Sequence, residues 1–129
     1  MIFITGPRYS GKRTYIRHAL GLTDEEFSQR SACEVQDRLS GTVSEEELER
    51  LADELNEFAV VTASETGCGV IPVDAAERAK REAAGRLACL LAERADVVIR
   101  MCCGLPEFLK GQGLPSKGKL TGHLSIMKH

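Results

Sequence analysis

Three short apolar runs along the chain have the pattern of buried β-strands. They are "MIFIT" at residues 1–5, "EFAVVTAS" at residues 57–64 and "DVVIRMCC" at residues 96–103. Apolar runs of this length, bounded by polar or glycine-containing turns, are typical of parallel strands that are covered on both faces. The sequence "PEFLK" at residues 106–110 predicts a further short edge strand after the turn at Gly104.

Helical spacing appears between these strands. "GKRTYIRHAL" predicts a helix after the first strand, and Thr23 with Glu26 forms a capping box for a second one. Ser44 with Glu47 forms another capping box, and the helix that follows keeps apolar residues on one face. These apolar residues are Leu48, Leu51, Ala52 and Leu55.

A long helix is predicted from Asp74 to about Arg94, and it is opened by a capping box of Asp74 with Glu77. Its expected buried stripe consists of Ala76, Ala79, Ala83, Leu87 and Leu90. The segment "SACEVQDRL" at residues 31–39 is ambiguous, because it fits either a short strand that closes near Val35 or an irregular link.

Strands that alternate with helices predict an α/β fold: a mostly parallel sheet with helices on both faces and ligands at the carboxyl ends of the strands. Two glycine loops, Gly6–Gly11 and Gly67–Gly69, follow strands at that end. We expect one domain over residues 1–110. Residues 111–129 lack periodicity and are rich in glycine and lysine, so we expect a flexible tail there.

The composition narrows the class of protein. The 129 residues carry 17 basic and 19 acidic side chains, a balance that does not suggest a nucleic-acid or membrane-surface partner. No apolar run is long enough to span a membrane and no secretory signal is recognisable, so we expect a soluble, cytoplasmic protein. The 5 cysteines and 3 histidines are scattered, and their spacing predicts no metal site.

The sequence "GPRYSGKRT", Gly6 to Thr14, nearly matches the phosphate-binding pattern G-x-x-x-x-G-K-[ST]. Such a loop binds phosphates through its backbone amides, the positive end of the following helix and its lysine. The pattern predicts a P-loop NTPase-like three-layer sandwich that binds ATP or GTP, with a merely structural turn as the alternative. The expected nucleotide-binding residues are Gly6, Arg8, Ser10, Gly11, Lys12, Arg13 and Thr14.

Arg13 departs from the pattern, because a serine or threonine hydroxyl normally coordinates Mg²⁺ at this position. Thr14 does not replace that hydroxyl, since one residue along a helix rotates the side chain by about 100°. Arg13 and Arg8 would instead bring positive charge to the phosphates. We therefore expect nucleotide binding with a weakened dependence on Mg²⁺.

The second half of the chain resembles the adenosylcobinamide kinase/adenosylcobinamide-phosphate guanylyltransferase family. That family shows N-E-V-G-x-G-I-V-P after a strand, R-D-x-x-G-R-x-N-Q on a helix, and A-D-x-V before a strand that ends in G-[LI]-P and a lysine. The matching residues are Glu65, Gly67, Gly69, Ile71, Pro72, Arg81, Gly85, Arg86, Ala95, Asp96, Gly104, Leu105, Pro106 and Lys110. The loop also resembles the family's T-G-G-A-R-S-G-K-S, with Thr5, Gly6, Ser10, Gly11 and Lys12 retained.

The resemblance implies phosphoryl transfer from ATP or GTP to the hydroxyl on the aminopropanol arm of adenosylcobinamide. Lys12 and the loop amides would carry the largest share of the positioning and charge neutralisation. Glu65 would position a metal-bound water or the attacking hydroxyl, with a helix or turn cap as its alternative role. Asp37 could replace the missing acidic magnesium partner, or be a solvated turn residue. Arg81 and Arg86 fit surface ion pairs better than phosphate ligands. The family's assembly into oligomers makes a homo-oligomer a further expectation.

This chain also departs from the family. Ser64 stands for the family's asparagine, and residues 22–57 contain no histidine, although the family carries its guanylylated histidine in that interval. We therefore expect the kinase step with the guanylyltransferase step lost. The alternative is a non-catalytic pseudoenzyme of the same fold that binds a nucleotide or a partner.

Overall fold

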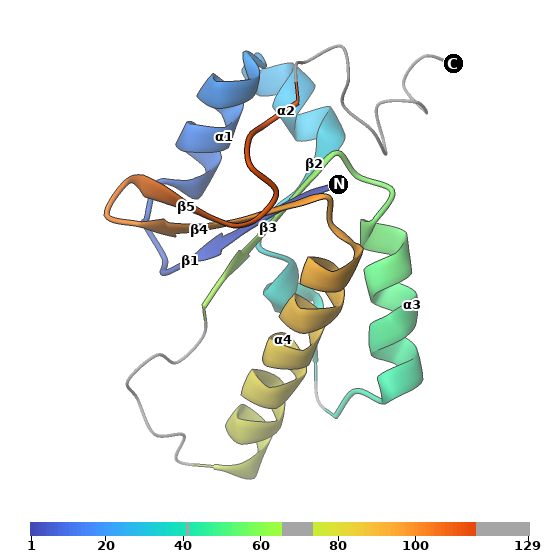
Figure 1. The fold of residues 1–129 in the computed structure, drawn as a ribbon. Coiled ribbons are helices and arrows are strands. Elements are labelled where there is room, and N and C mark those ends of the chain that lie inside the picture. The colour runs from blue at the N-terminus through green and yellow to red at the C-terminus, as the bar shows by residue number, and fades with distance from the viewer. Residues whose placement is uncertain (41, 66–73, 116–129) are drawn as a thin grey trace.

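The computed structural model describes residues 1–40, 42–65 and 74–115. Five strands form one sheet in the order β2-β3-β1-β4-β5 (Figure 1). The strands are β1 (Ile2–Gly6), β2 (Ser31–Ala32), β3 (Val60–Ser64), β4 (Val97–Cys102) and β5 (Leu105–Lys110). The first four in the sheet order run parallel, and β5 pairs antiparallel with β4 as the sheet's edge.

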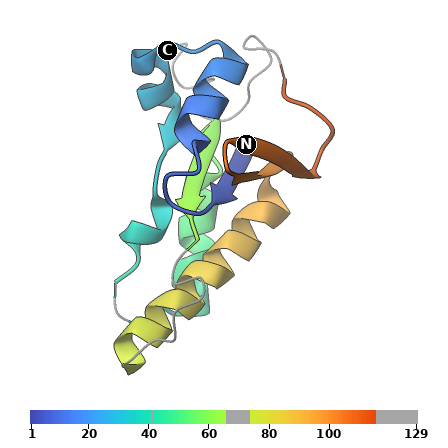
Figure 2. The ribbon, with the colours of Figure 1, turned by 90° about the vertical axis from the view of Figure 1, so that its left-hand side faces the viewer.

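Helices cover both faces of the sheet. On one face lie α1 (Lys12–Leu20) and α2 (Asp24–Arg30), and on the other lie α3 (Glu45–Leu55) and α4 (Ala75–Arg94) (Figures 1 and 2). A short 3₁₀ helix, η1 (Val35–Arg38), follows β2. The expected α/β three-layer sandwich, with a mostly parallel sheet, is confirmed.

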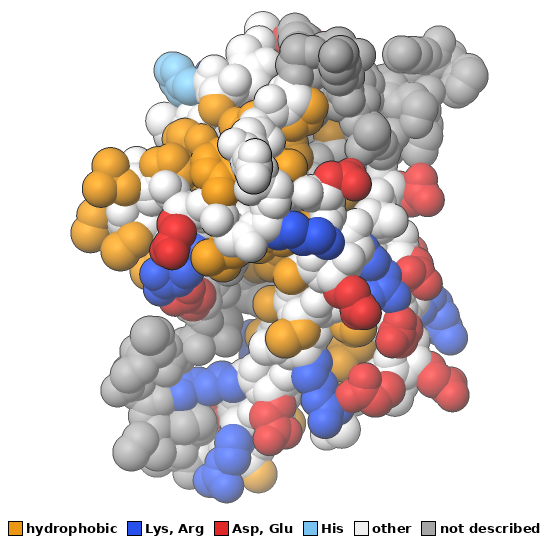
Figure 3. All heavy atoms as spheres, in the orientation of Figure 1, with side chains coloured by type: hydrophobic (Ala, Val, Ile, Leu, Met, Phe, Trp, Pro, Cys, Tyr) orange, Lys and Arg blue, Asp and Glu red, His pale blue; other side chains and the backbone are white. Residues whose placement is uncertain are grey.

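Each face has its own core because side chains alternate along a strand. On β1, Ile2 and Ile4 belong to the core beneath α1 and α2, whereas Phe3 belongs to the core beneath α3 and α4. On β4, Ile99 and Val98 divide in the same way. Figure 3 shows apolar side chains gathered over α1 and β5, where Leu105 and Leu109 are exposed, and mixed charges over α3 and α4.

Two local expectations are resolved by tertiary packing. "SACEVQDRL" contains only the two-residue strand β2 before the chain turns into η1. On α4, Ala83 and Leu87 are buried as expected, but Ala76 is exposed and Leu91 is buried in place of Leu90. The first turns of α4 extend beyond the sheet in Figure 1, so no sheet residue covers Ala76 there.

Several sequence expectations fall outside the described residues. The glycine loop Gly67–Gly69 is one, and residues 116–129 of the expected tail are another. Of the tail's described part, Leu114 is partly buried against the core beneath α1. In the described ranges, every helix is too short or too polar to cross a membrane.

The capping box at α2 provides a test of the local fold. Thr23 Oγ1 accepts from the Glu26 amide at 3.1 Å, and the Thr23 amide donates to Glu26 Oε1 at 3.1 Å. We expect Thr23→Ala to lower the free energy of unfolding by about 1 kcal/mol, because it removes this cap. Denaturant unfolding would measure the change, with Ser28→Ala on the exposed face of α2 as the control. Equal stability of the two variants would contradict the assignment.

Candidate functional site

The loop between β1 and α1 follows a backbone course that requires glycine at both ends. Gly6 has φ 149° and Gly11 has φ 87°. A Cβ on Gly6 would lie 2.5 Å from the carbonyl oxygen of Met101, so β4 passes too close for any side chain. Gly11 then precedes Lys12, the first residue of α1, in a left-handed conformation.

Two neighbouring segments hold this loop. The Glu65 amide donates to the Gly6 carbonyl at 2.9 Å, and the Gly104 amide donates to the Ser10 carbonyl at 3.2 Å. The loop is therefore fixed by the end of β3 and by the turn between β4 and β5. The first turn of α1 contains no acidic residue, which leaves the positive end of the helix uncompensated for an anion.

Lys12 is buried although it carries an ammonium group, with only 5% of the residue exposed. Its Nζ donates to the Pro7 carbonyl at 3.0 Å, to Ser64 Oγ at 3.1 Å and to the Gly6 carbonyl at 3.5 Å. Burial lowers the pKa of Lys12 below its ordinary value of 10.5, while Glu34 and Glu65 oppose that shift. The ammonium is thus partnered by protein oxygens and held at the loop.

A carboxylate from β2's carboxyl end completes this network. Glu34 adopts a left-handed backbone with φ 52°, and its Oε1 accepts from Ser64 Oγ at 2.9 Å. Its Oε2 accepts from Gln36 Nε2 at 2.6 Å, and the Gln36 side chain in turn accepts from the Ser64 amide at 3.1 Å. Although burial opposes ionisation, these hydrogen bonds and the charge of Lys12 lower the pKa of Glu34. Glu34 is therefore an ionised carboxylate beside the loop.

These groups line one cavity of about 350 Å³, which we call the loop cavity. Its size lies at the lower end of the range for small-molecule sites. Its lining residues are Arg8, Tyr9, Ser10, Gly11, Lys12, Arg13, Thr14, Glu34 and Ser64. All the expected nucleotide-binding residues except Gly6 are among them, and Gly6 lies at the loop's start.

The two loop arginines have partners outside the phosphate pattern. The Arg13 guanidinium lies over the Phe27 ring of α2, 5.8 Å from its centroid. Arg8 forms an ion pair with Asp37 at 3.8 Å, and both side chains are more than half exposed. Asp37 is therefore tied to the loop through Arg8. The buried Oγ of Ser10 has no hydrogen-bond partner among the described residues.

Glu65 lies on the other side of β3 from this network. Its carboxylate accepts from Arg100 of β4, with Nε–Oε1 at 2.7 Å and Nη2–Oε2 at 3.2 Å. It lines a second cavity beneath α4 rather than the loop cavity. Ser64 lines both cavities, so Glu65 is adjacent to the loop cavity through its neighbour in the chain.

Glu34 and Arg100 were not expected as site residues. Glu34 lies in the ambiguous segment, where neither helical nor alternating spacing gave a signal. The one available signal was topological, because ligands gather at the carboxyl ends of parallel strands. In the described ranges, no group of three or more potential metal-binding side chains occurs.

Comparison with protein families gives one finding for this chain. The model of the family described as "cobinamide kinase / cobinamide phosphate guanyltransferase" matches residues 31–109, about three fifths of the chain. A comparison with curated proteins found no match. The matched range contains Glu34, Ser64 and Glu65, whereas the loop from Gly6 to Thr14 lies before it.

The loop geometry is testable at Gly6. We expect Gly6→Ala to lower the free energy of unfolding by about 1–3 kcal/mol, because a Cβ would displace β4 or the loop. Thermal unfolding would measure this effect. Gly113→Ala is the matched control, since a Cβ there meets no atom within 4 Å. Unchanged stability of Gly6→Ala would contradict the close approach of β4 to the loop.

Proposed function

This chain belongs to the cobinamide kinase/cobinamide phosphate guanyltransferase family, and we propose that it binds ATP or GTP at its phosphate loop and phosphorylates a cobinamide. The observation that carries the proposal is the buried Lys12 at the helix-opening glycine loop, joined through Ser64 to the carboxylate of Glu34. Nothing in a purely structural turn would need a buried ammonium. The negative charge of a bound phosphate would offset the desolvation cost of the buried Lys12 ammonium.

Nucleotide binding would exchange the partners of Lys12. In the free protein, two carbonyl oxygens and Ser64 Oγ accept from its Nζ. The β and γ phosphates would replace the carbonyl contacts with charge-assisted hydrogen bonds, which are roughly twice as strong as neutral ones. The loop amides and the positive end of α1 would hold the remaining phosphate oxygens.

Magnesium fits this cavity, although the usual hydroxyl is missing. Nucleotide-bound Mg²⁺ needs only one or two carboxylates besides phosphate oxygens and water. The loop cavity supplies Glu34, which would hold the ion, and the unpartnered Oγ of Ser10. When bound, the ion would neutralise charge on the phosphates. Because Arg13 contacts Phe27 and offers no ligand, we propose a weaker Mg²⁺ requirement than in loops with serine at this position.

Phosphoryl transfer would take place where the two cavities meet at Ser64. The acceptor's hydroxyl oxygen would bond to the γ phosphorus while the bond from that phosphorus to the bridging oxygen breaks, which releases the nucleoside diphosphate. We assign Glu65 the role of orienting the hydroxyl and taking its proton, since carboxylate oxygens accept further hydrogen bonds beside an arginine. Lys12 would stabilise the charge that develops on the phosphoryl oxygens.

A non-catalytic protein that binds a nucleotide is the second candidate. The observation that favours it is Arg13, which stands in place of the magnesium-binding hydroxyl and is engaged with Phe27. Such a protein would bind ATP or GTP through Lys12 and transfer nothing. The experiment on Lys12 therefore measures binding and transfer separately.

We expect Lys12→Ala to weaken ATP or GTP binding by roughly 30-fold, the effect of losing about 2 kcal/mol of charged hydrogen bonding. Calorimetric titration with and without Mg²⁺ measures binding, and mass spectrometry measures phosphorylated cobinamide. Lys110→Ala is the control, because the Lys110 ammonium also donates to two backbone carbonyls, at 3.1 and 3.2 Å. These carbonyls belong to the C-terminal end of α4 and not to the loop. Unchanged affinity in Lys12→Ala would refute the nucleotide site, and binding without transfer would favour the non-catalytic candidate.

The pH dependence of binding offers a second readout on Lys12. Burial lowers the pKa of Lys12 in the free protein, whereas bound phosphate favours the charged form. Affinity should therefore fall as pH rises through the free protein's lysine pKa, starting below the ordinary value of 10.5. Lys12→Ala should lack this decline. A decline of equal size in both proteins would assign it to the nucleotide or to another group.

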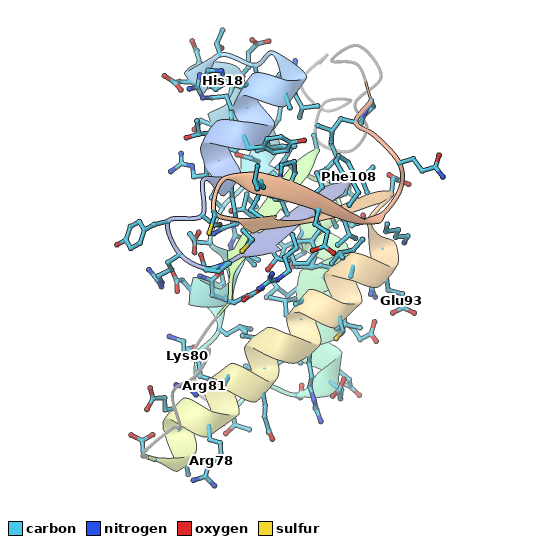
Figure 4. All side chains as sticks on the ribbon, turned by 60° about the vertical axis from the view of Figure 1, so that its left-hand side comes forward. His18, Arg78, Lys80, Arg81, Glu93 and Phe108 are labelled. Atoms are coloured by element: carbon cyan, nitrogen blue, oxygen red, sulfur yellow. The ribbon has the colours of Figure 1, made fainter. Side chains whose placement is uncertain are left out.

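We further propose that the guanylyltransferase step is lost. A histidine nucleophile needs to reach the α phosphate, but His18 is exposed at the far end of α1 from the loop (Figure 4). His123 and His129 lie outside the described residues. We expect no covalent label on the protein after incubation with α-labelled GTP, with His18→Ala run in parallel. Stoichiometric, acid-labile label that disappears when one histidine is replaced would contradict this.

A further inference from the structure

The second cavity lies between the sheet and α4, on the opposite face from α1, and we call it the α4 cavity. Its volume is about 230 Å³, which is smaller than a typical site for a whole drug-sized ligand. Its lining residues are Thr5, Val35, Gln36, Ala63, Ser64, Glu65, Arg81, Ala84, Gly85, Leu87, Ala88 and Leu91. Ser64 is the residue that this cavity shares with the loop cavity.

The lining of the α4 cavity has an apolar part and a charged part. Val35, Leu87 and Leu91 are buried side chains that give an apolar floor. Glu65, held by Arg100, and Arg81 of α4 add charged groups to the same wall. A largely apolar cavity with a few charged groups is the usual form of a site for a small amphipathic group.

Gly85 is a residue of the cavity lining that carries no side chain. It lies in the middle of α4, where glycine destabilises a helix by roughly 1 kcal/mol relative to alanine. Neither of the usual reasons for glycine applies, since its φ is not positive and a Cβ would meet no atom within 4 Å. Gly85 is exposed, and it lines the cavity together with Ala84 and Ala88. A ligand that approaches the helix backbone would explain the glycine.

The two arginines on this helix differ in where they lie. Arg86 pairs with Glu45 of α3, and both side chains are more than half exposed. The Arg81 side chain is only 19% exposed, pairs with Glu77 at 4.0 Å and contributes to the cavity wall. Figure 4 shows Arg81 on the first half of α4. Arg81 is thus the charged group of α4 that a bound molecule would meet.

We propose that the α4 cavity binds the hydroxyl-bearing arm of the phosphate acceptor, an inference that rests on the kinase function proposed above. The volume admits a short amide chain and excludes a macrocycle, which would remain outside. Aliphatic carbons of the arm would contact Leu87 and Leu91, and Arg81 would donate to its amide oxygen. The hydroxyl would lie at Glu65 and face the γ phosphate across Ser64. Gly85 and Arg81 therefore determine acceptor specificity.

The cavity is tested by filling it. We expect Gly85→Leu to raise the KM for cobinamide at least 10-fold, while the nucleotide Kd stays within 2-fold of the wild type. Ala76→Leu also places a leucine on α4, at its exposed start, and should change neither value. Thermal unfolding would test whether Gly85→Leu is folded. Gly85→Ala should have a higher melting temperature than the wild type, because alanine favours a helix. An unchanged KM in a folded Gly85→Leu protein that still phosphorylates cobinamide would overturn the inference and leave the kinase function intact.

Arg81→Gln tests the charged wall against Arg86→Gln, a matched loss of one arginine from the same helix. We expect weaker cobinamide binding in the first variant and wild-type binding in the second. Equilibrium dialysis of cobinamide, followed by its absorbance, is run with a non-hydrolysable nucleotide, so the result does not depend on turnover. Equal affinity in the two variants would overturn the inference, whereas no cobinamide binding by the wild type would refute the proposed kinase function. Absence of nucleotide binding by the wild type would likewise refute the proposed function.

Discussion

The hydroxyl of Ser64 is the contact on which the rest of the site depends. It accepts from Lys12 Nζ at 3.1 Å and donates to Glu34 Oε1 at 2.9 Å, so it joins the loop to the neighbouring strand. A lysine buried without such partners would lose its charge, because desolvation of an isolated ammonium is far more costly than deprotonation. The Ser64 amide is itself fixed by Gln36, which is 2% exposed. The cationic loop is thereby built on groups that lie far from it in sequence.

Side chains alternate between the two faces of the sheet along β3, so consecutive polar residues at its end lie on opposite faces. Ser64 contacts the loop, and Glu65, one residue later, points to Arg100 and the cavity beneath α4. A one-residue shift of β3 would exchange these roles and expose the core side chains as well. The register is fixed by pairing of β3 with β1 from Ile2–Val60 to Gly6–Ser64. The same pairing that builds the core therefore sets the boundary between the two cavities.

The sequence predicted features whose signals are local. Apolar runs marked the strands β1, β3 and β4. Capping residues marked the starts of α2, α3 and α4: the side chains of Thr23, Ser44 and Asp74 each accept from the expected backbone amide. The course of residues 31–39 was not predictable, because Glu34 adopts its left-handed backbone against Thr62, whose Oγ1 accepts from the Glu34 amide at 3.1 Å. The buried face of α4 has the predicted helical period, but it begins later along the helix than predicted. The extent of the sheet decides which turns of α4 are covered, and the helix sequence alone does not contain it. The loop residues were found by motif, whereas their partner Glu34 required the strand order.

The loop and the family-matched range, residues 31–109, contribute different parts of the proposed site, which explains how an arginine can occupy position 13. In the proposed function, phosphate binding would depend on the backbone at Gly6 and Gly11 and on Lys12, and none of these needs a hydroxyl at the next position. Because successive residues of a helix point about 100° apart, Arg13 can lie against Phe27 without disturbing Lys12. The carboxylates Glu34 and Glu65 both come from the matched range. In the proposed site, an arginine at position 13 would therefore remove one cation ligand and leave the phosphate contacts and the groups that face the acceptor in place, so nucleotide binding could persist without transfer.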